Sequence, residues 1–172
     1  MAYEFYISIE GQKQGKFKGE SGRRAPSGEG TDNGRGLGRD KIAGVRFVSE
    51  ASSPRDVATG QASGKRTHKP ILITKEWGAA SPQLFQALVT NENLKSVLFE
   101  FVKTNAQGEE EIYHTIKLTN AAVSNIKSYL DLTDTTGDPY DAHELEDVSF
   151  VFQKIEMENK EGKTQAVDSW QV

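Results

Sequence analysis

The stretch of the sequence that comes nearest to a chemical motif lies at residues 60–67. It reads Gly60-Gln61-Ala62-Ser63-Gly64-Lys65-Arg66-Thr67. In a phosphate-binding P-loop, four residues separate the two glycines, Ser or Thr follows the lysine to bind magnesium, and a helix comes next. Here three residues separate the glycines, Arg66 follows Lys65, and the pattern after it is that of a strand. We therefore predict a plain loop with no nucleotide bound.

A second glycine cluster, at residues 34–39, invites comparison with a dinucleotide-binding loop. Gly34, Gly36 and Gly38 are present, but Arg39 stands where the third glycine of that motif belongs. No strand leads into the cluster and no helix pattern follows it, and the motif needs both. A flexible loop is the better interpretation.

The histidines and carboxylates form no catalytic or metal-binding pattern. His68, His114 and His143 are not spaced as metal ligands, and no G-x-S-x-G elbow accompanies a possible Ser-His-Asp set. The acidic clusters at 109–111 and 131–138 do not match a calcium-binding loop. With no cysteine in the chain, thiolate chemistry is excluded. We predict no catalytic residues, no cofactor and no metal, and hence a protein that is not an enzyme.

Composition limits the class of protein further. The chain has 172 residues with 35% hydrophobic residues, which suits one domain over residues 1–172. A formal net charge of -4 does not favour nucleic-acid binding, and the basic loop residues are better suited to acidic surfaces of a like subunit. No apolar run approaches the roughly 18 residues of a membrane span. The first residues have no signal-peptide pattern, and the absence of cysteine fits a reducing cytoplasm.

Most of the remaining sequence predicts antiparallel β-structure. Alternating or apolar runs indicate strands at residues 3–10, 42–48, 71–76, 97–102, 112–118 and 145–158, with a short strand possible near 166–170. Residues 119–130 suit a helix or a strand equally. About eight strands without βαβ alternation predict a mainly β fold, a β-barrel or sandwich of two antiparallel sheets with one short helix alongside.

One helix is predicted after residue 80. Ser81 is a good N-cap and Pro82 suits the first helical position. Apolar residues then follow at helical spacing and predict one buried stripe: Leu84, Phe85, Leu88 and Val89. The helix should end near residues 90–93.

Two loops indicate that something outside the domain orders them, and one strand leaves the same possibility open. Two long polar loops, at residues 19–41 and 50–69, are unusual in a compact domain of this size. The apolar face also changes along residues 145–158, from Val148 and Phe150 to Val151 and Ile155. A bulge or bend explains the change, because a one-residue shift flips a strand. Alternatively, the core covers one face and a neighbouring subunit covers the other.

Residues 53–70 carry a more specific pattern. They read Ser53-Pro54-Arg55-Asp56, then Gly60-Gln61-Ala62-Ser63-Gly64-Lys65-Arg66, then His68-Lys69-Pro70, and Ser81-Pro82-Gln83-Leu84 follows. This arrangement resembles the Hcp family, the haemolysin-coregulated proteins that form the inner tube of the bacterial type VI secretion system. The segments 6–11, 97–118, 148–156 and 168–170 also resemble that family, whereas the loop at 19–40 is longer than in many members.

The resemblance implies a ring-forming structural protein. In the family, six copies form a ring, and rings stack into a tube inside a contractile sheath, with a spike protein at the tip. Some effector proteins travel in the ring lumen, where the ring protects them. The family has no catalytic residues. For this chain it implies a Gram-negative bacterium as source and a cytoplasmic protein that is later secreted without a signal peptide.

The same resemblance suggests where the subunit meets its neighbours. Loop 50–69 would reach an adjacent subunit or ring, and we predict that five of its residues make polar contacts there: Arg55, Asp56, Lys65, Arg66 and His68. Disorder of this loop in an unstacked ring is the alternative. Three other functions stay open: a phage-tail-tube-like protein, a secreted effector enzyme, and a monomeric binding module.

Overall fold

The computed structural model describes residues 4–19, 41–131 and 143–170 of the chain. Within these ranges the chain forms eleven strands and one helix, in the order β1 (Glu4–Gly11), β2 (Gly15–Lys16), β3 (Ile42–Gly44), β4 (Arg46–Val48), β5 (Ala51–Ser52), β6 (Thr67–His68), β7 (Ile71–Glu76), α1 (Ala80–Val89), β8 (Leu94–Thr104), β9 (Glu110–Asp131), β10 (His143–Asn159) and β11 (Thr164–Ser169).

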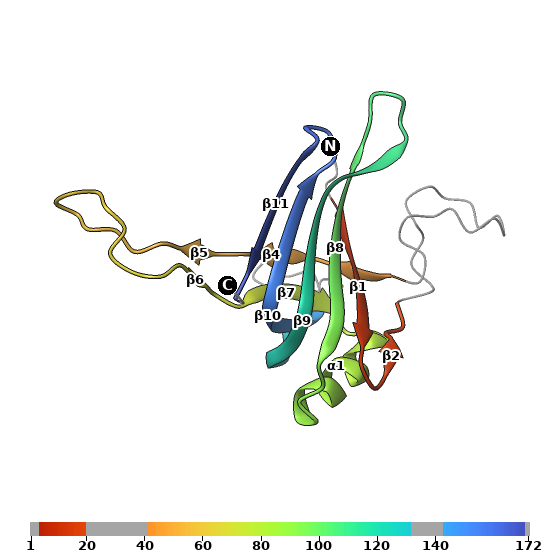
Figure 1. The fold of residues 1–172 in the computed structure, drawn as a ribbon. Helices are drawn as coiled ribbons and strands as arrows, with labels where there is room; N and C mark the ends of the chain where they lie inside the picture. Colours follow the sequence, from red (N-terminus) through yellow and green to blue (C-terminus); the bar gives the residue numbers. More distant parts are fainter. Residues whose placement is uncertain (1–3, 20–40, 132–142, 171–172) are drawn as a thin grey trace.

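Nine strands make one curled antiparallel sheet, and β5 and β6 make a separate two-stranded ribbon (Figure 1). The neighbours along the sheet run β2-β1-β8-β9-β10-β7-β4, while β3 pairs with β1 and β11 with β10. Only Val45 separates β3 from β4. The segment 42–48 therefore pairs with β1 at one end and with β7 at the other, and links the two ends of the curled sheet. The predicted mainly β, antiparallel fold with a helix alongside is confirmed.

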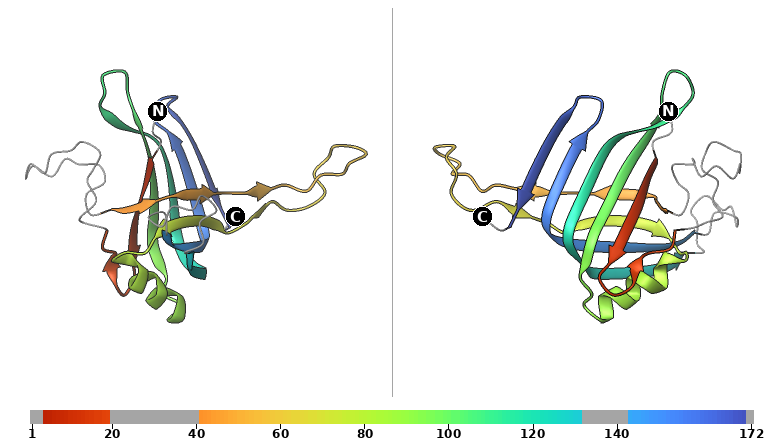
Figure 2. Two further views of the ribbon diagram at one scale, coloured as in Figure 1. Left: turned by 180° about the vertical axis from the view of Figure 1, so that it is seen from behind. Right: turned by 45° about the vertical axis from the view of Figure 1, so that its right-hand side comes forward.

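The two longest strands, β9 and β10, bend together partway along their length (Figure 2). Asn120 in β9 has a positive φ of 50°, and its amide Nδ2 donates to Gln153 Oε1 of β10 at 2.6 Å. In β9 the buried positions are even-numbered up to Leu118 and odd-numbered from Ala121. In β10 the same change separates Phe150 from Ile155, so the face change predicted for residues 145–158 accompanies a bend.

A bulge accompanies this bend. Ser149 of β10 pairs with Asn125 and the next residue, Phe150, pairs with Val123, which leaves Ser124 of β9 as the extra residue. Residues 119–130, for which the sequence left helix and strand open, therefore continue β9. The bend lets β10 pair with β7 over residues 145–150 and with β11 over residues 154–159.

The core lies inside the curl of the sheet. Its fully buried members include Ile7, Leu84, Phe99, Leu118 and Phe150. At one end, an aromatic group closes the core: the rings of Phe5 and Phe101 stack at 5.5 Å and the ring of Phe47 meets Phe101 edge-on at 5.1 Å. Gly44 lies against this group, and a Cβ there would fall 2.1 Å from the Phe5 ring. A side chain at Gly44 would displace the Phe5 ring.

The helix begins differently from the prediction. Its N-cap is Ala79, which makes no side-chain cap, and Ser81 lies inside the first turn. The Ser81 hydroxyl instead accepts a hydrogen bond from the Gly78 N–H at 3.0 Å and donates one to Glu146 Oε1 at 2.8 Å. The Ser81 hydroxyl therefore binds Glu146 of β10, whereas the sequence pattern predicted that it would cap the helix.

The buried side of the helix also differs in part from the prediction. Ala80, Leu84 and Ala87 are its buried residues, whereas Phe85 and Val89 are more than half exposed. Leu88, also in the predicted stripe, is partly buried against the core. The helix ends at Val89, with Thr90 as C-cap, as predicted.

A buried ion pair lies beneath the start of the helix. Lys75 Nζ of β7 donates to Glu146 Oε1 of β10 at 2.6 Å, and both side chains are buried. Lys75 Nζ also donates to the Glu76 carbonyl at 2.8 Å and to Ser81 Oγ at 3.2 Å. No pattern in the sequence indicated this pair.

Part of the sequence-based expectations falls outside the described ranges. Most of the predicted loop 19–41 and its arginines lie there, as does the segment 132–142. Among the described residues, there is no helix with both the length and the apolar character that a membrane crossing requires.

Candidate functional site: a ribbon that leaves the sheet

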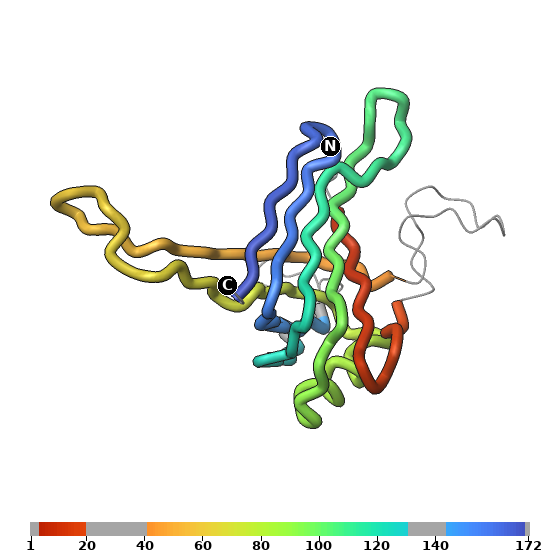
Figure 3. The backbone as a smooth tube through the Cα atoms, in the orientation of Figure 1, coloured from red at the N-terminus to blue at the C-terminus, as the bar shows by residue number. Residues whose placement is uncertain are grey.

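Residues 49–70 form an arm that extends away from the sheet in every view of the chain (Figures 1 and 3). Every residue from 49 to 67 is exposed. The arm is nevertheless ordered along its stem, where Ala51 pairs with His68 and Ser52 with Thr67. The hydroxyls of Ser52 and Thr67 lie 2.9 Å apart. The predicted loop 50–69 is therefore a preformed β-ribbon.

The tip of the ribbon is a defined turn. Arg55 and Ala62 form an isolated β-bridge. Asp56 closes the turn with its backbone, because its N–H donates to the Gln61 carbonyl and its own carbonyl accepts from Gly60 N–H, both at 2.8 Å. Its Oδ1 also accepts from Ala58 N–H at 2.8 Å, an Asx-turn contact. Gly60 has a φ of +71°, which favours glycine.

The tip presents an apolar side chain to solvent. Val57 stands between Asp56 and Ala58 and is fully exposed. Arg55 lies two residues before Val57, and its guanidinium donates to the Gly60 carbonyl at 3.2 Å. The turn therefore presents one apolar side chain to solvent, with the charged residues Arg55 and Asp56 before it in the sequence.

The root of the ribbon is attached to the C-terminal strand. Asp168 Oδ2 of β11 accepts from Arg66 Nε at 2.6 Å and lies 2.6 Å from His68 Nε2. Arg66 Nη2 also donates to the Ser169 carbonyl at 3.0 Å. The hydrogen bond from Arg66, with that from His68, holds the pKa of the Asp168 carboxyl well below its usual range. The same hydrogen bond to Asp168 raises the pKa of Arg66.

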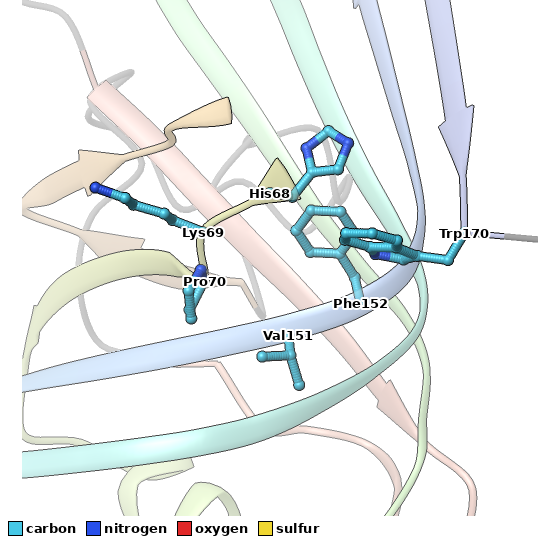
Figure 4. A pocket seen from close by; sticks show the side chains of 6 residues that line it. All are labelled: His68, Lys69, Pro70, Val151, Phe152 and Trp170. Atoms are coloured by element: carbon cyan, nitrogen blue, oxygen red, sulfur yellow. The ribbon is translucent and has the colours of Figure 1, made fainter. Parts of the chain in front are cut away.

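Aromatic rings enclose the histidine at this root. The His68 ring lies edge-on to Phe152 at 5.4 Å and to Trp170 at 5.5 Å. A cavity of about 230 Å³ opens beside them, lined by His68, Lys69, Pro70, Val151, Phe152 and Trp170. Figure 4 shows Phe152 and Trp170 beneath the imidazole, with the Lys69 side chain directed away from them.

The structure places the five predicted contact residues at the tip, on the returning arm and at the root of the ribbon. Arg55 and Asp56 lie at the tip, Lys65 is exposed on the returning arm, and Arg66 and His68 meet at Asp168. Their role in contacts with another copy stays a prediction. Among the residues that the structure describes, no group of three or more histidines and carboxylates is arranged to hold a metal ion.

Sequence reasoning missed Asp168 and Trp170 as part of this site. They lie about one hundred positions along the chain from Arg66 and His68, and nothing local links an acidic residue in a terminal strand to a histidine in a loop. The one available signal was the resemblance at residues 168–170, which did not assign either residue a partner.

Comparisons with known proteins agree with this fold. Residues 6–158 match the family model described as "Type VI secretion system effector, Hcp". The chain is 35% identical over 170 residues to the "Major exported protein" of Pseudomonas aeruginosa, and the match covers 99% of this chain and 96% of that protein.

Solved structures give the same result. The chain superposes on a crystal structure of an Hcp protein with a TM-score of 0.83 at 29% identity, over 99% of both chains. It also superposes on a secreted Hcp protein of Pseudomonas aeruginosa with a TM-score of 0.71 at 29% identity, over 99% of this chain and 100% of that one. The predicted family resemblance is confirmed, and the chain belongs to the Hcp family of the type VI secretion system.

Proposed function

We propose that this chain is the structural subunit of a type VI secretion inner tube, in which six copies form a ring and rings stack along an axis. A contractile sheath expels the tube, a spike protein caps it, and effector proteins travel in its lumen. The family membership supports the assignment to this secretion system. Ring number, stacking and cargo are parts of the proposal.

The observation that carries the proposal is the ribbon at residues 49–70. Within its own subunit the ribbon buries almost no surface, because residues 49–67 are exposed. Ordering a chain segment costs about 1–2 kcal/mol per residue in backbone entropy, and an ordered but solvated arm recovers that cost when it contacts another molecule. A protruding arm that meets a different surface of an identical copy makes a heterologous contact, which closes into a ring or continues as a stack.

The same proposal covers location and partners. The chain is made in the cytoplasm of a Gram-negative bacterium and leaves the cell through the secretion machine. A relative that is 35% identical is named as an exported protein. Its partners are further copies of itself, then the sheath, the spike and effector proteins.

Light scattering on a sizing column tests the proposal, with electron microscopy of the peak. A mass near six subunits, seen as rings, is the expected result. Longer stacks at high protein concentration would support tube formation as well. A monomer at high concentration contradicts the proposal and favours an exported binding module that uses the cavity beside Trp170.

A further inference from the structure

The ribbon leaves the body at a point where the strand ladder is interrupted. β4 pairs with β7 up to Val48 and Leu72, and the ribbon pairs again at Ala51 and His68. Pro70 lies between these two sections, and proline has no N–H to donate to a ladder. Residues 49–50 and 69–70 are therefore a natural pivot. Across it, the Lys69 N–H donates to the Glu50 carbonyl at 3.0 Å, and their side chains form an exposed ion pair.

The carboxylate of Asp168 connects the ribbon to the main sheet across this pivot. Arg66 and His68 are two residues apart on the returning arm, so their side chains leave the same face of the strand. Both reach the same oxygen, Oδ2 of Asp168, at 2.6 Å. Asp168 is held in β11 by its pairing with Ile155 of β10. The acceptor therefore belongs to the main sheet and the donors belong to the ribbon.

Two further contacts limit how the ribbon can turn about this point. The second guanidinium nitrogen of Arg66 donates to the Ser169 carbonyl at 3.0 Å, which fixes the plane of the guanidinium. Phe152 of β10 and Trp170 after β11 both lie against the His68 ring. Hydrogen bonds to a charged group are about twice as strong as neutral ones, and here they act together with ring contacts.

We propose that Asp168 is a positioning residue, which holds the ribbon of each free subunit in one direction before it meets another copy of the chain. Asp168, Arg66 and His68 form a clamp across the pivot, and we name them the root clamp. A ribbon that is already fixed in direction loses less conformational freedom on association, which favours binding. The clamp itself consists of contacts within one subunit, and only its effect on assembly rests on the proposed function.

A distance measurement between two spin labels tests the root clamp directly. Because the chain contains no cysteine, Ala58→Cys at the ribbon tip and Gln107→Cys in the β8–β9 hairpin give two unique labels at exposed positions. The labelled chain is measured at a concentration at which light scattering gives the mass of one subunit, so that no neighbouring copy holds the ribbon and each distance lies within one subunit. The unmodified clamp should give one narrow distance peak.

Asp168→Asn should broaden that peak, because it removes the charge that both donors share. Arg66→Gln is measured in parallel; Arg66 is on the exposed arm, so this variant leaves the core intact if Asp168→Asn folds poorly. Glu156→Gln is the matched control: Glu156 lies on neighbouring β10 and forms a partly exposed pair with Lys154 at 3.2 Å. It loses the same carboxylate charge and should keep the narrow peak.

A peak that stays narrow in Asp168→Asn and in Arg66→Gln overturns the root clamp. A peak that broadens to the same extent in Glu156→Gln also overturns it, because general loss of charge would then explain the effect. The mass of each variant, measured by light scattering, separates this proposal from the previous one. A broad peak in a variant that assembles normally supports the clamp and counts against its proposed effect on assembly.

Discussion

At the scale of single residues, two groups of charged side chains have different environments. Lys75 and Glu146 are buried and make further hydrogen bonds, from Lys75 to the Glu76 carbonyl and from the Ser81 hydroxyl to Glu146. Asp168 with Arg66 lies in a partly exposed position. Burying a charge is costly unless it is paired and hydrogen-bonded. The first pair therefore matters chiefly for the stability of the subunit, and the second for the direction of the ribbon.

Lys75→Met should destabilise the subunit strongly, because it leaves the Glu146 carboxylate buried without its ammonium partner. Removing one member of a buried pair costs about 3–5 kcal/mol. Lys75→Met with Glu146→Leu should recover much of that loss, since both charges are then absent. Urea unfolding followed by circular dichroism measures the difference. Lys69→Met, which removes an exposed ion pair with Glu50, is the control and should cost about 0–1 kcal/mol; an equal loss in both single variants would contradict the argument.

The root clamp should persist in mild acid. Arg66 and then His68 lower the pKa of Asp168 below its ordinary value, so the contribution of this carboxylate is fully present above the unperturbed pKa of about 3.9. It is lost only as the pH falls through the lower folded-state pKa. The tip-to-body distance peak of the doubly labelled chain should therefore stay narrow from neutral pH down to about pH 4. Broadening well above that pH would show that Asp168 is not the group that holds the ribbon.

At the scale of elements, the bend in β9 and β10 decides how the sheet curls. Asn120 adopts a left-handed backbone conformation there and its side chain reaches Gln153 across the strands. Asparagine is one of the few residues that adopt this conformation without large cost. At the bend, the buried positions of both strands shift by one residue. As a result, β7 and β11 pair with different parts of the same strand, β10.

Asn120→Val should therefore be more harmful than Asn120→Gly. Both variants lose the hydrogen bond to Gln153, but only valine adds the clash of Cβ with the backbone at positive φ, worth about 1–2 kcal/mol. Thermal unfolding of the two variants compares them on the same background. If valine and glycine destabilise the fold equally, the backbone conformation of Asn120 is not what sets the bend.

At the scale of the whole molecule, the subunit is a well-packed curled sheet with one arm outside it. The core is closed by the aromatic group around Phe5 and by the helix. Residues 53–64 contribute no side chain to it. Exposed apolar side chains remain at the ribbon tip, on the helix and near the C-terminal strand: Val57, Phe85, Val89, Val151, Val167 and Trp170. Stability and assembly should therefore respond to different substitutions.

Val57→Asp should leave the folded subunit as stable as the unmodified one while it weakens assembly. Val57 is fully exposed in the subunit, so folding does not bury the new carboxylate. In an interface, the same carboxylate would lose its water. Gln107→Asp in the other exposed hairpin is the control for charge. Unfolding midpoint and oligomer mass are measured for both variants. Unchanged assembly in Val57→Asp would show that the ribbon tip makes no contact that matters between copies.

The β-strands themselves were largely predictable. Alternation at residues 4–10 and 71–76, the strands at 97–102 and 112–118 and the helix near Leu84 depend on periodicity, which is a local property. The motif at residues 53–70 identified the family in the same way, as a run of residues in fixed order. The predicted Ser81 cap was wrong, because a partner on β10 uses its hydroxyl.

What the sequence by itself determined was the class of fold, the family, and the presence of a polar segment that contributes nothing to the core. Only the tertiary structure decided that this segment is a ribbon, where β9 and β10 bend, and which carboxylates meet Lys75, Arg66 and His68. The physical reason is that backbone preference and apolar periodicity are fixed by neighbours in the chain. An ion pair between residues 66 and 168 exists only after β11 has paired with β10 and placed the carboxylate beside the arm.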